Sequence, residues 1–113
     1  MRVYWVKKYF PAFVFYTNWF VRYGGMTVGP FVFIKPKERP PMEAEGLLQH
    51  ELTHARQFYS PSKWFWGTLK WEVEAYKVQL QYVPNDLEVF AYYLSTRYGL
   101  NITKDEAIAL LQA

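Results

Sequence analysis

The sequence changes character at Pro40-Pro41, and this change limits the folds open to the chain more than any other feature. Before it, short runs rich in β-branched and aromatic residues alternate with Gly and Pro, a pattern typical of strands joined by turns. After it, apolar residues recur at helical spacing. We therefore predict an α+β fold in which a small N-terminal sheet, antiparallel or mixed, is followed by several helices.

Three or four short strands are expected, at residues 3–6, 13–16, 19–21 and 31–34. Residues 10–22 form an almost continuous apolar run, which a buried helix would also explain. Four helices are expected, at residues 43–59, from 62 or 63 to 82, at 86–98 and from Thr103 onward. Thr103 and Glu106 have the spacing of a capping box, which supports the start of the last helix.

The chain has 113 residues, of which 51% are hydrophobic and 21% aromatic, so it can bury a core without metal or disulfide staples. This length predicts a single domain over residues 1–113. The net charge of +3 comes from scattered cations, which excludes nucleic acid as an expected partner. The absence of cysteine excludes thiolate nucleophiles and Cys-type zinc sites.

The apolar segment from Tyr9 to Val21 raises the question of a membrane anchor, because it follows Lys7 and Lys8. Pro11 interrupts the segment, which is shorter than the ~20 residues a membrane-spanning helix needs. We expect buried strands here and a cytoplasmic protein; association with a membrane through residues 9–21 is the alternative.

The two histidines of the chain are His50 and His54, and Glu51 directly follows the first, which gives the motif HExxH. On a helix, residues four apart share a face, so both imidazoles can reach one zinc ion while the glutamate holds a metal-bound water. Chance places these residues at this spacing on the order of once in a thousand sequences. The apolar stripe formed by Leu48, Leu52, Ala55 and Tyr59 lies about half a turn away, as a ligand helix requires.

A catalytic zinc site needs a third protein ligand, and no histidine remains to supply it. The candidates are Glu72 and Glu74 on the second helix. At ~100° per residue, Glu72 lies about 70° from the centre of the apolar stripe of that helix and Glu74 about 130° from it. Lys70 and Lys77 are placed to pair with Glu74 in solvent. We therefore predict Glu72 as the third ligand, with Glu74 as the alternative.

HExxH over His50 to His54, followed 18 residues later by Glu72-Val73-Glu74-Ala75, resembles the HExxH and ExEA motifs of gluzincin metallopeptidases, particularly the single-domain minigluzincins. The resemblance covers about 40 residues. It implies a zincin-like fold, with Zn²⁺ bound by His50, His54 and Glu72. Many gluzincins carry an aspartate four residues after the glutamate ligand, and Tyr76 stands there in this chain.

The resemblance implies peptide-bond hydrolysis, with a peptide or protein as the substrate. Glu51 would accept a proton from the attacking water and pass it to the leaving amine. Four residues could stabilise the oxyanion: Tyr76, Tyr92, Tyr93 and Arg97. The strand at residues 31–34 resembles the edge strand that pairs with substrate in zincins, although an ordinary structural strand is an equal alternative.

Three further expectations concern the surroundings of the motif. Gln57 lies on the ligand face and is expected to be a solvated side chain rather than part of the cleft. The amphipathic segment from Leu100 to Ala113 could fold over the site and make the enzyme latent. The alternative function is a non-catalytic binding module that keeps the zincin scaffold and docks a partner through its aromatic surface.

Overall fold

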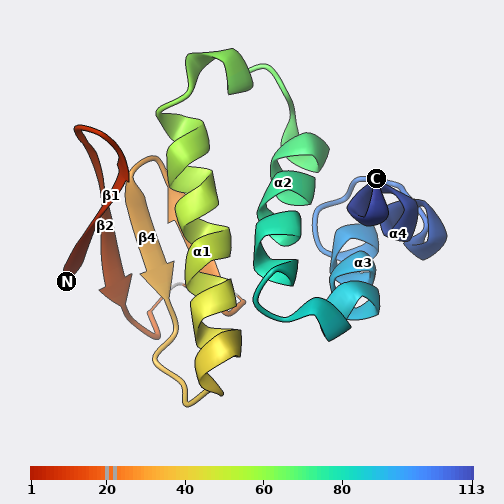
Figure 1. The fold of residues 1–113 in the computed structure, drawn as a ribbon, viewed down its shortest axis with the longest axis horizontal. Helices are drawn as coiled ribbons and strands as arrows, with labels where there is room; N and C mark the ends of the chain where they lie inside the picture. The colour runs from red at the N-terminus through yellow and green to blue at the C-terminus, as the bar shows by residue number, and fades with distance from the viewer. Residues whose placement is uncertain (20, 22) are drawn as a thin grey trace.

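A computed structural model describes residues 1–19, 21 and 23–113. Four strands precede four α-helices in this part of the chain (Figure 1), which confirms the α+β class. The strands are β1 (Arg2–Lys7), β2 (Phe10–Tyr16), β3 (Gly25–Val28) and β4 (Phe31–Ile34). The α-helices are α1 (Pro41–Phe58), α2 (Thr68–Leu80), α3 (Leu87–Thr96) and α4 (Lys104–Gln112).

The four strands form one mixed sheet in the order β1-β2-β4-β3. β2 and β4 are parallel, with Val14 opposite Val32, whereas the β1–β2 and β3–β4 pairs are antiparallel. β3 was not predicted, because its four residues include Gly25 and form no run of β-branched residues. The strand expected at residues 19–21 is wrong at Trp19 and Val21, which lie outside strands; residue 20 lies outside the described residues.

One face of the sheet packs on α1. The alternating pattern of β2 turns Ala12 and Val14 inward, where both side chains are fully buried. They belong to a first hydrophobic core, formed by Val6, Ala12, Val14, Val32, Ile34, Leu48, Leu52 and Ala55. This arrangement confirms the predicted apolar stripe of α1 and shows that residues 10–16 form a strand rather than a helix.

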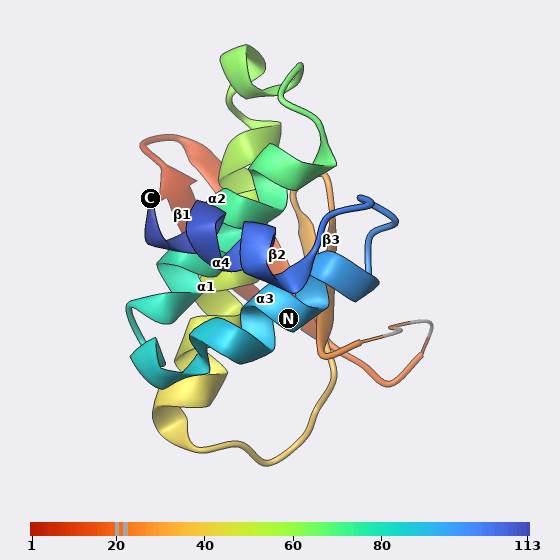
Figure 2. The same ribbon diagram turned by 90° about the vertical axis from the view of Figure 1, so that its right-hand side faces the viewer.

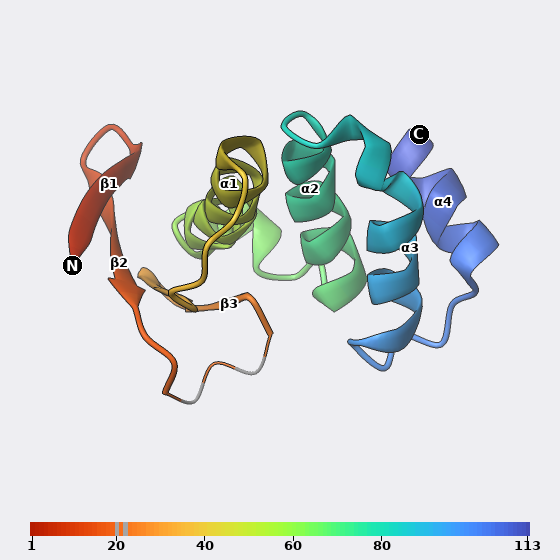
Figure 3. The ribbon, with the colours of Figure 1, turned by 90° about the horizontal axis from the view of Figure 1, so that it is seen from below.

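The other side of α1 packs on α2, so α1 lies between the sheet and the remaining helices (Figure 3). Gly46 permits close approach, because a Cβ there would lie 3.2 Å from Gln79 Cγ and 3.3 Å from Tyr82 Cβ. α3 and α4 lie beyond α2 and face the viewer in Figure 2. They enclose a second core with α2, formed by Tyr76, Phe90, Ala91, Leu94, Ala107 and Leu111.

The predicted second helix begins too early, because residues 62–67 belong to the connection between α1 and α2. Residues Pro61–Lys63 form a single 3₁₀ turn, and α2 begins only at Thr68. Gly67 precedes it with a φ of 83°, a left-handed conformation that ends any helix arriving from the N-terminal side. The capping box of α4 is confirmed, because Thr103 and Glu106 exchange both hydrogen bonds.

In the part of the chain that the structure describes, no helix combines the length and the apolar character that a membrane span requires. Most of the segment that raised this question, residues 9–21, is strand β2, which pairs with strands on both sides.

Candidate metal centre

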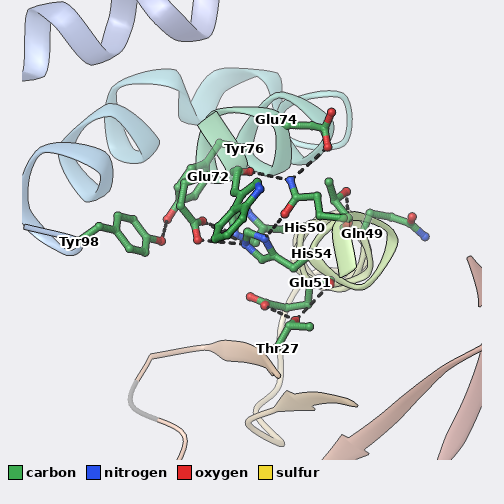
Figure 4. A network of polar contacts seen from close by, with 12 residues as sticks. Thr27, Gln49, His50, Glu51, His54, Glu72, Glu74, Tyr76 and Tyr98 are labelled. Carbon is green, nitrogen blue, oxygen red and sulfur yellow. Dashed lines mark hydrogen bonds and ion pairs between the residues drawn. The ribbon is translucent and has the colours of Figure 1, made fainter. Parts of the chain in front are cut away.

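His50, His54 and Glu72 converge between α1 and α2 (Figure 4). His50 Nε2 lies 3.2 Å from Glu72 Oε1, and His54 Nε2 lies 3.1 Å from Glu72 Oε2. One ligand atom from each of the three side chains lies within 4.8 Å of the other two. The helical spacing of the histidines brings their Nε2 atoms to the same carboxylate, as the sequence predicts. Glu72, rather than Glu74, is the glutamate at this position.

In the metal-free protein, a protonated histidine compensates the negative charge of Glu72. Burial opposes protonation of His54, but its hydrogen bond to Glu72 and the negative charge of that carboxylate together raise the pKa of His54 to about 9. Burial would likewise favour the neutral form of Glu72, but hydrogen bonds from His50 and His54 lower the pKa of Glu72 to about 2. The site therefore holds a proton beside an ionised carboxylate, in the place where a cation would bind.

The donor set fits zinc. Two imidazole nitrogens and one carboxylate oxygen, which leave the fourth position of a tetrahedron open, are the ligand set of catalytic zinc sites. The ring of His50 is fixed by packing, because the ring of Tyr76 meets it edge-on with the centroids 4.4 Å apart. Nδ1 of His50 is buried and has no hydrogen-bond partner among the described residues.

Gln57 orients the second histidine. His54 Nδ1 donates to Gln57 Oε1 at 2.8 Å, so a neutral His54 carries its hydrogen on Nδ1 and presents the lone pair of Nε2 to the site. Gln57 Nε2 in turn donates to Trp71 O at 3.0 Å and to Glu74 Oε1 at 3.1 Å. Lys63 Nζ completes this chain of contacts, 2.9 Å from Glu74 Oε2.

These contacts correct two expectations from the sequence. Gln57 is buried, with only 5% of its surface exposed, and is not a solvated side chain. Glu74 pairs with Lys63 and Gln57 rather than with Lys70 or Lys77. Helical spacing could not predict the contact between Lys63 and Glu74, because Lys63 lies before Gly67, in the connection that was predicted as helix.

Glu72 reaches the histidines from α2, whereas Glu51 lies on the side of the histidines that faces the edge strand β3. Thr27 Oγ1 donates to Glu51 Oε1 at 2.8 Å and contacts Glu51 O at 3.1 Å (Figure 4). Gly25 leaves room for the carboxylate, because a Cβ at this position would lie 3.1 Å from Glu51 Oε2. No pattern in the sequence indicates Thr27 or Gly25 as site residues, since both lie on the strand that was not predicted.

A cavity of about 580 Å³ opens onto the site. His50, Glu51, His54 and Glu72 line it, together with apolar side chains that include Met26, Leu47, Phe58, Trp71 and Phe90. An extended segment of another chain with apolar or aromatic side chains could lie in this space, with one of its peptide bonds next to the histidines. No residue from Leu100 to Ala113 is among the lining residues; α4 packs on α2 and α3 instead.

Tyrosines and one arginine complete the lining. Of the four candidate oxyanion stabilisers, Tyr76, Tyr93 and Arg97 line the cavity, whereas Tyr92 lies outside it with 54% of its surface exposed. Tyr98, which the sequence did not single out, lies in the cavity with its hydroxyl 2.6 Å from that of Tyr76. Burial and the nearby charge of Glu72 raise the pKa of both hydroxyls, so both are protonated at neutral pH.

Comparison of the chain with protein-family models, with curated proteins and with solved structures gives no match. The interpretation of the site therefore depends on its residues and their geometry.

Proposed function

We propose that the protein is a zinc-dependent peptidase of the gluzincin type with a zincin-like fold, acting on a peptide or protein substrate. The observation that carries this proposal is the convergence of His50, His54 and Glu72 while Glu51 lines the same cavity and contributes no atom to the ligand group. Catalytic zinc sites combine three protein ligands of this kind with a carboxylate that is not a ligand. A purely structural role for the histidines would not require the adjoining cavity.

Zinc held by these three side chains would supply a Lewis acid that polarises the scissile carbonyl and acidifies water. Glu51 is the base of the reaction: its carboxylate accepts the proton of the attacking water and delivers it to the leaving amine. The hydrogen bond from Thr27 fixes one oxygen of Glu51, and the second oxygen, next to Gly25, remains for the proton. Gln57 keeps Nε2 of His54 directed at the metal position.

The substrate would lie along β3, the edge strand of the sheet on the side of the site. The expectation that β4 is this edge strand is wrong, because β4 pairs with both β2 and β3. The free edge of β3 offers backbone groups to an extended peptide, which would pass over Gly25 and Thr27 and therefore past Glu51.

The Tyr76–Tyr98 pair is suited to stabilise the oxyanion. Each hydroxyl carries one hydrogen, and the bond between the two consumes only one of them. The second hydrogen is left to donate to a negative oxygen that develops in the cavity. Replacing both Tyr76 and Tyr98 by Phe removes this donor and should lower kcat by about tenfold or more while leaving zinc bound.

Zinc content of purified protein tests the ligand assignment. We expect about one zinc per chain in the wild type and its loss in His54→Ala and Glu72→Gln. Glu74→Gln tests the alternative ligand and should keep the ion, with at most the weaker binding that loss of an indirect support causes, because Glu74 contacts Gln57 and Lys63 instead of the histidines. Glu43→Gln, in the exposed first turn of α1, is the matched control. A folded wild type that binds no zinc, or a Glu74→Gln variant that loses zinc while Glu72→Gln keeps it, would contradict the assignment.

Hydrolysis of a peptide pool by zinc-loaded protein, followed by mass spectrometry, tests the reaction. Glu51→Gln should retain zinc and lose at least ~100-fold in rate, since it removes the base but none of the ligands. Zinc binding without hydrolysis of any peptide would instead favour the non-catalytic binding module.

A further inference from the structure

Arg97 is a cation of the cavity that the proposed reaction does not use. It follows α3 directly, and its guanidinium carbon lies 3.4 Å from the ring centre of Tyr93 and 4.1 Å from that of Tyr23. These contacts join the end of α3 to Tyr23, which precedes β3, and all three residues line the cavity. The side chain is therefore held in place rather than free in solvent.

Within the described part of the chain, the N–H donors of the Arg97 side chain have no hydrogen-bond acceptor. Contacts with aromatic faces use the charge of the guanidinium but none of its five N–H donors. Among the described residues, none accepts a hydrogen bond from this side chain, and no carboxylate forms an ion pair with it. It is also the one Lys or Arg among the described residues that line the cavity. A guanidinium that is held in place, and whose donors have no acceptor among the described residues, is suited to bind a planar anion.

The position of Tyr23 sets the distance from this cation to the reacting bond. Tyr23 precedes Gly25, the residue beside the Glu51 carboxylate, by two positions. Tyr23 and Gly24 form a bend before β3, so these two residues of backbone span at most about 7 Å. A substrate lying along β3 with its scissile bond at Glu51 would therefore place a group two residues or fewer away next to Arg97.

We propose that Arg97 forms a carboxylate-binding subsite, so that the preferred substrate carries a carboxylate within about two residues of the scissile bond. This inference rests on the proposed function and names its substrate class. The carboxylate has two possible sources, the free C-terminus of a peptide or an internal Asp or Glu side chain. The guanidinium fork would bind either through paired N–H donors.

Binding to metal-free protein tests the subsite without hydrolysis and without zinc competing for the carboxylate. The probes are acetylated Ala/Phe tetrapeptides in four forms: a free C-terminus, an amidated C-terminus, and two amidated peptides with one internal Glu or the matching Gln. Calorimetric titration of the wild type should show binding at least ~10-fold tighter for a carboxylate form than for its neutral counterpart. Preference for the free C-terminus or for internal Glu identifies the source.

Arg97→Gln should abolish this preference, and Arg97→Lys should reduce it because lysine keeps the charge but lacks the fork. Lys104→Gln is the matched control, since it removes one positive charge from α4, away from the cavity. Thermal unfolding of each variant checks that it is folded. If Arg97→Gln weakens the charged and neutral peptides equally, Arg97 only joins the two segments and the proposal is wrong; equal affinities in the wild type overturn it as well.

The subsite and the proposed reaction can fail separately. Carboxylate preference without zinc binding or hydrolysis would support the subsite and refute the peptidase. In zinc-loaded protein, the ratio of kcat/KM for charged over neutral peptides should fall to about one in Arg97→Gln and stay unchanged in Lys104→Gln. Hydrolysis with no such ratio in the wild type would refute the subsite and leave the peptidase standing.

Discussion

Gln57 occupies the place that a carboxylate or a backbone carbonyl commonly takes beside a zinc-bound histidine. A neutral amide fixes the tautomer as a carboxylate does, but adds no negative charge to make the imidazole more basic. Glu74 supplies that charge one step further away, since it accepts from the same amide and is itself held by Lys63. The orientation of one metal ligand thus depends on a residue of α2 and on the connection that precedes it.

Replacing Gln57 by Leu should weaken zinc binding by 10- to 100-fold, the usual effect of losing such a partner, because His54 Nδ1 then lacks its acceptor. Competition with a chromophoric chelator measures the affinity. Gln49→Leu is the matched control, since Gln49 lies on the same helix and bonds Glu45 away from the metal ligands. Equal affinities in the two variants would show that Gln57 does not orient the ligand.

The His54–Glu72 pair predicts how the thermal stability of the metal-free protein depends on pH. The pKa of His54 is raised from 6.5 to about 9, so its contribution is complete below pH 6.5 and is lost as pH rises through 9. The pKa of Glu72 is lowered from 4.5 to about 2, so its contribution is complete above pH 4.5 and is lost as pH falls toward 2.

The Tm difference between metal-free wild type and Glu72→Gln, measured by circular dichroism, should therefore be largest between about pH 4.5 and 6.5. It should shrink on both sides of this window. A difference that does not vary with pH would show that the ion pair does not form in the metal-free protein.

The sequence predicted the convergence of the candidate ligands better than the contacts that support them, for a physical reason. The faces on which His50, His54 and Glu72 lie follow from the rotation of about 100° per residue in an α-helix. The Gln57 contact depends on how close α2 approaches α1, and Lys63 depends on where α2 begins. Neither quantity follows from the periodicity of a single helix.

At the scale of elements, β3 matters more than its four residues suggest. It forms the edge of the sheet and brings Thr27 and Gly25 to Glu51. Its sequence, Gly-Met-Thr-Val, has only two β-branched residues after a glycine, a run too short to predict a strand without its pairing to β4. The longer apolar strands were predictable from composition, whereas this strand requires the tertiary pairing to be known.

Gly25→Ala should lower kcat by about tenfold, because the added methyl displaces the Glu51 carboxylate by a fraction of an ångström. Zinc content should be unchanged, since no metal ligand is touched. Gly24→Ala is the control: a Cβ there meets Leu47 Cδ2 at 3.4 Å, which is ordinary contact. Steady-state kinetics of both variants, with zinc measured in the same samples, tests the difference. A Gly25→Ala enzyme with wild-type kcat would mean that Glu51 tolerates the shift.

At the scale of the whole molecule, the candidate metal centre lies at the boundary of two hydrophobic cores. The histidines extend from the helix that packs on the sheet, and Glu72 extends from the helix that packs on α3 and α4. The sequence predicted the order of strands and helices but not this division, because apolar periodicity identifies a buried face without identifying its partner.

Removal of residues 100–113 should destabilise the site rather than release it. The segment contributes Ala107 and Leu111 to the core that contains Tyr76, whose ring packs on His50. We expect a Tm lower by several degrees or more and weaker zinc binding, measured by calorimetry and chelator competition. Leu111→Ala should act in the same direction to a smaller extent. A folded truncated protein with increased peptidase activity would instead support a latent form closed by this segment.

The single connection between the two cores runs through residues 59–67, and the proposed metal ligands are divided across it. A backbone cut there would leave two pieces, one with both histidines and the other with the glutamate. Reassembly of the pieces would then depend on the free zinc concentration, because the ion would replace the lost covalent link. The architecture is therefore suited to serve as a split zinc sensor, in which association of the fragments reports the metal.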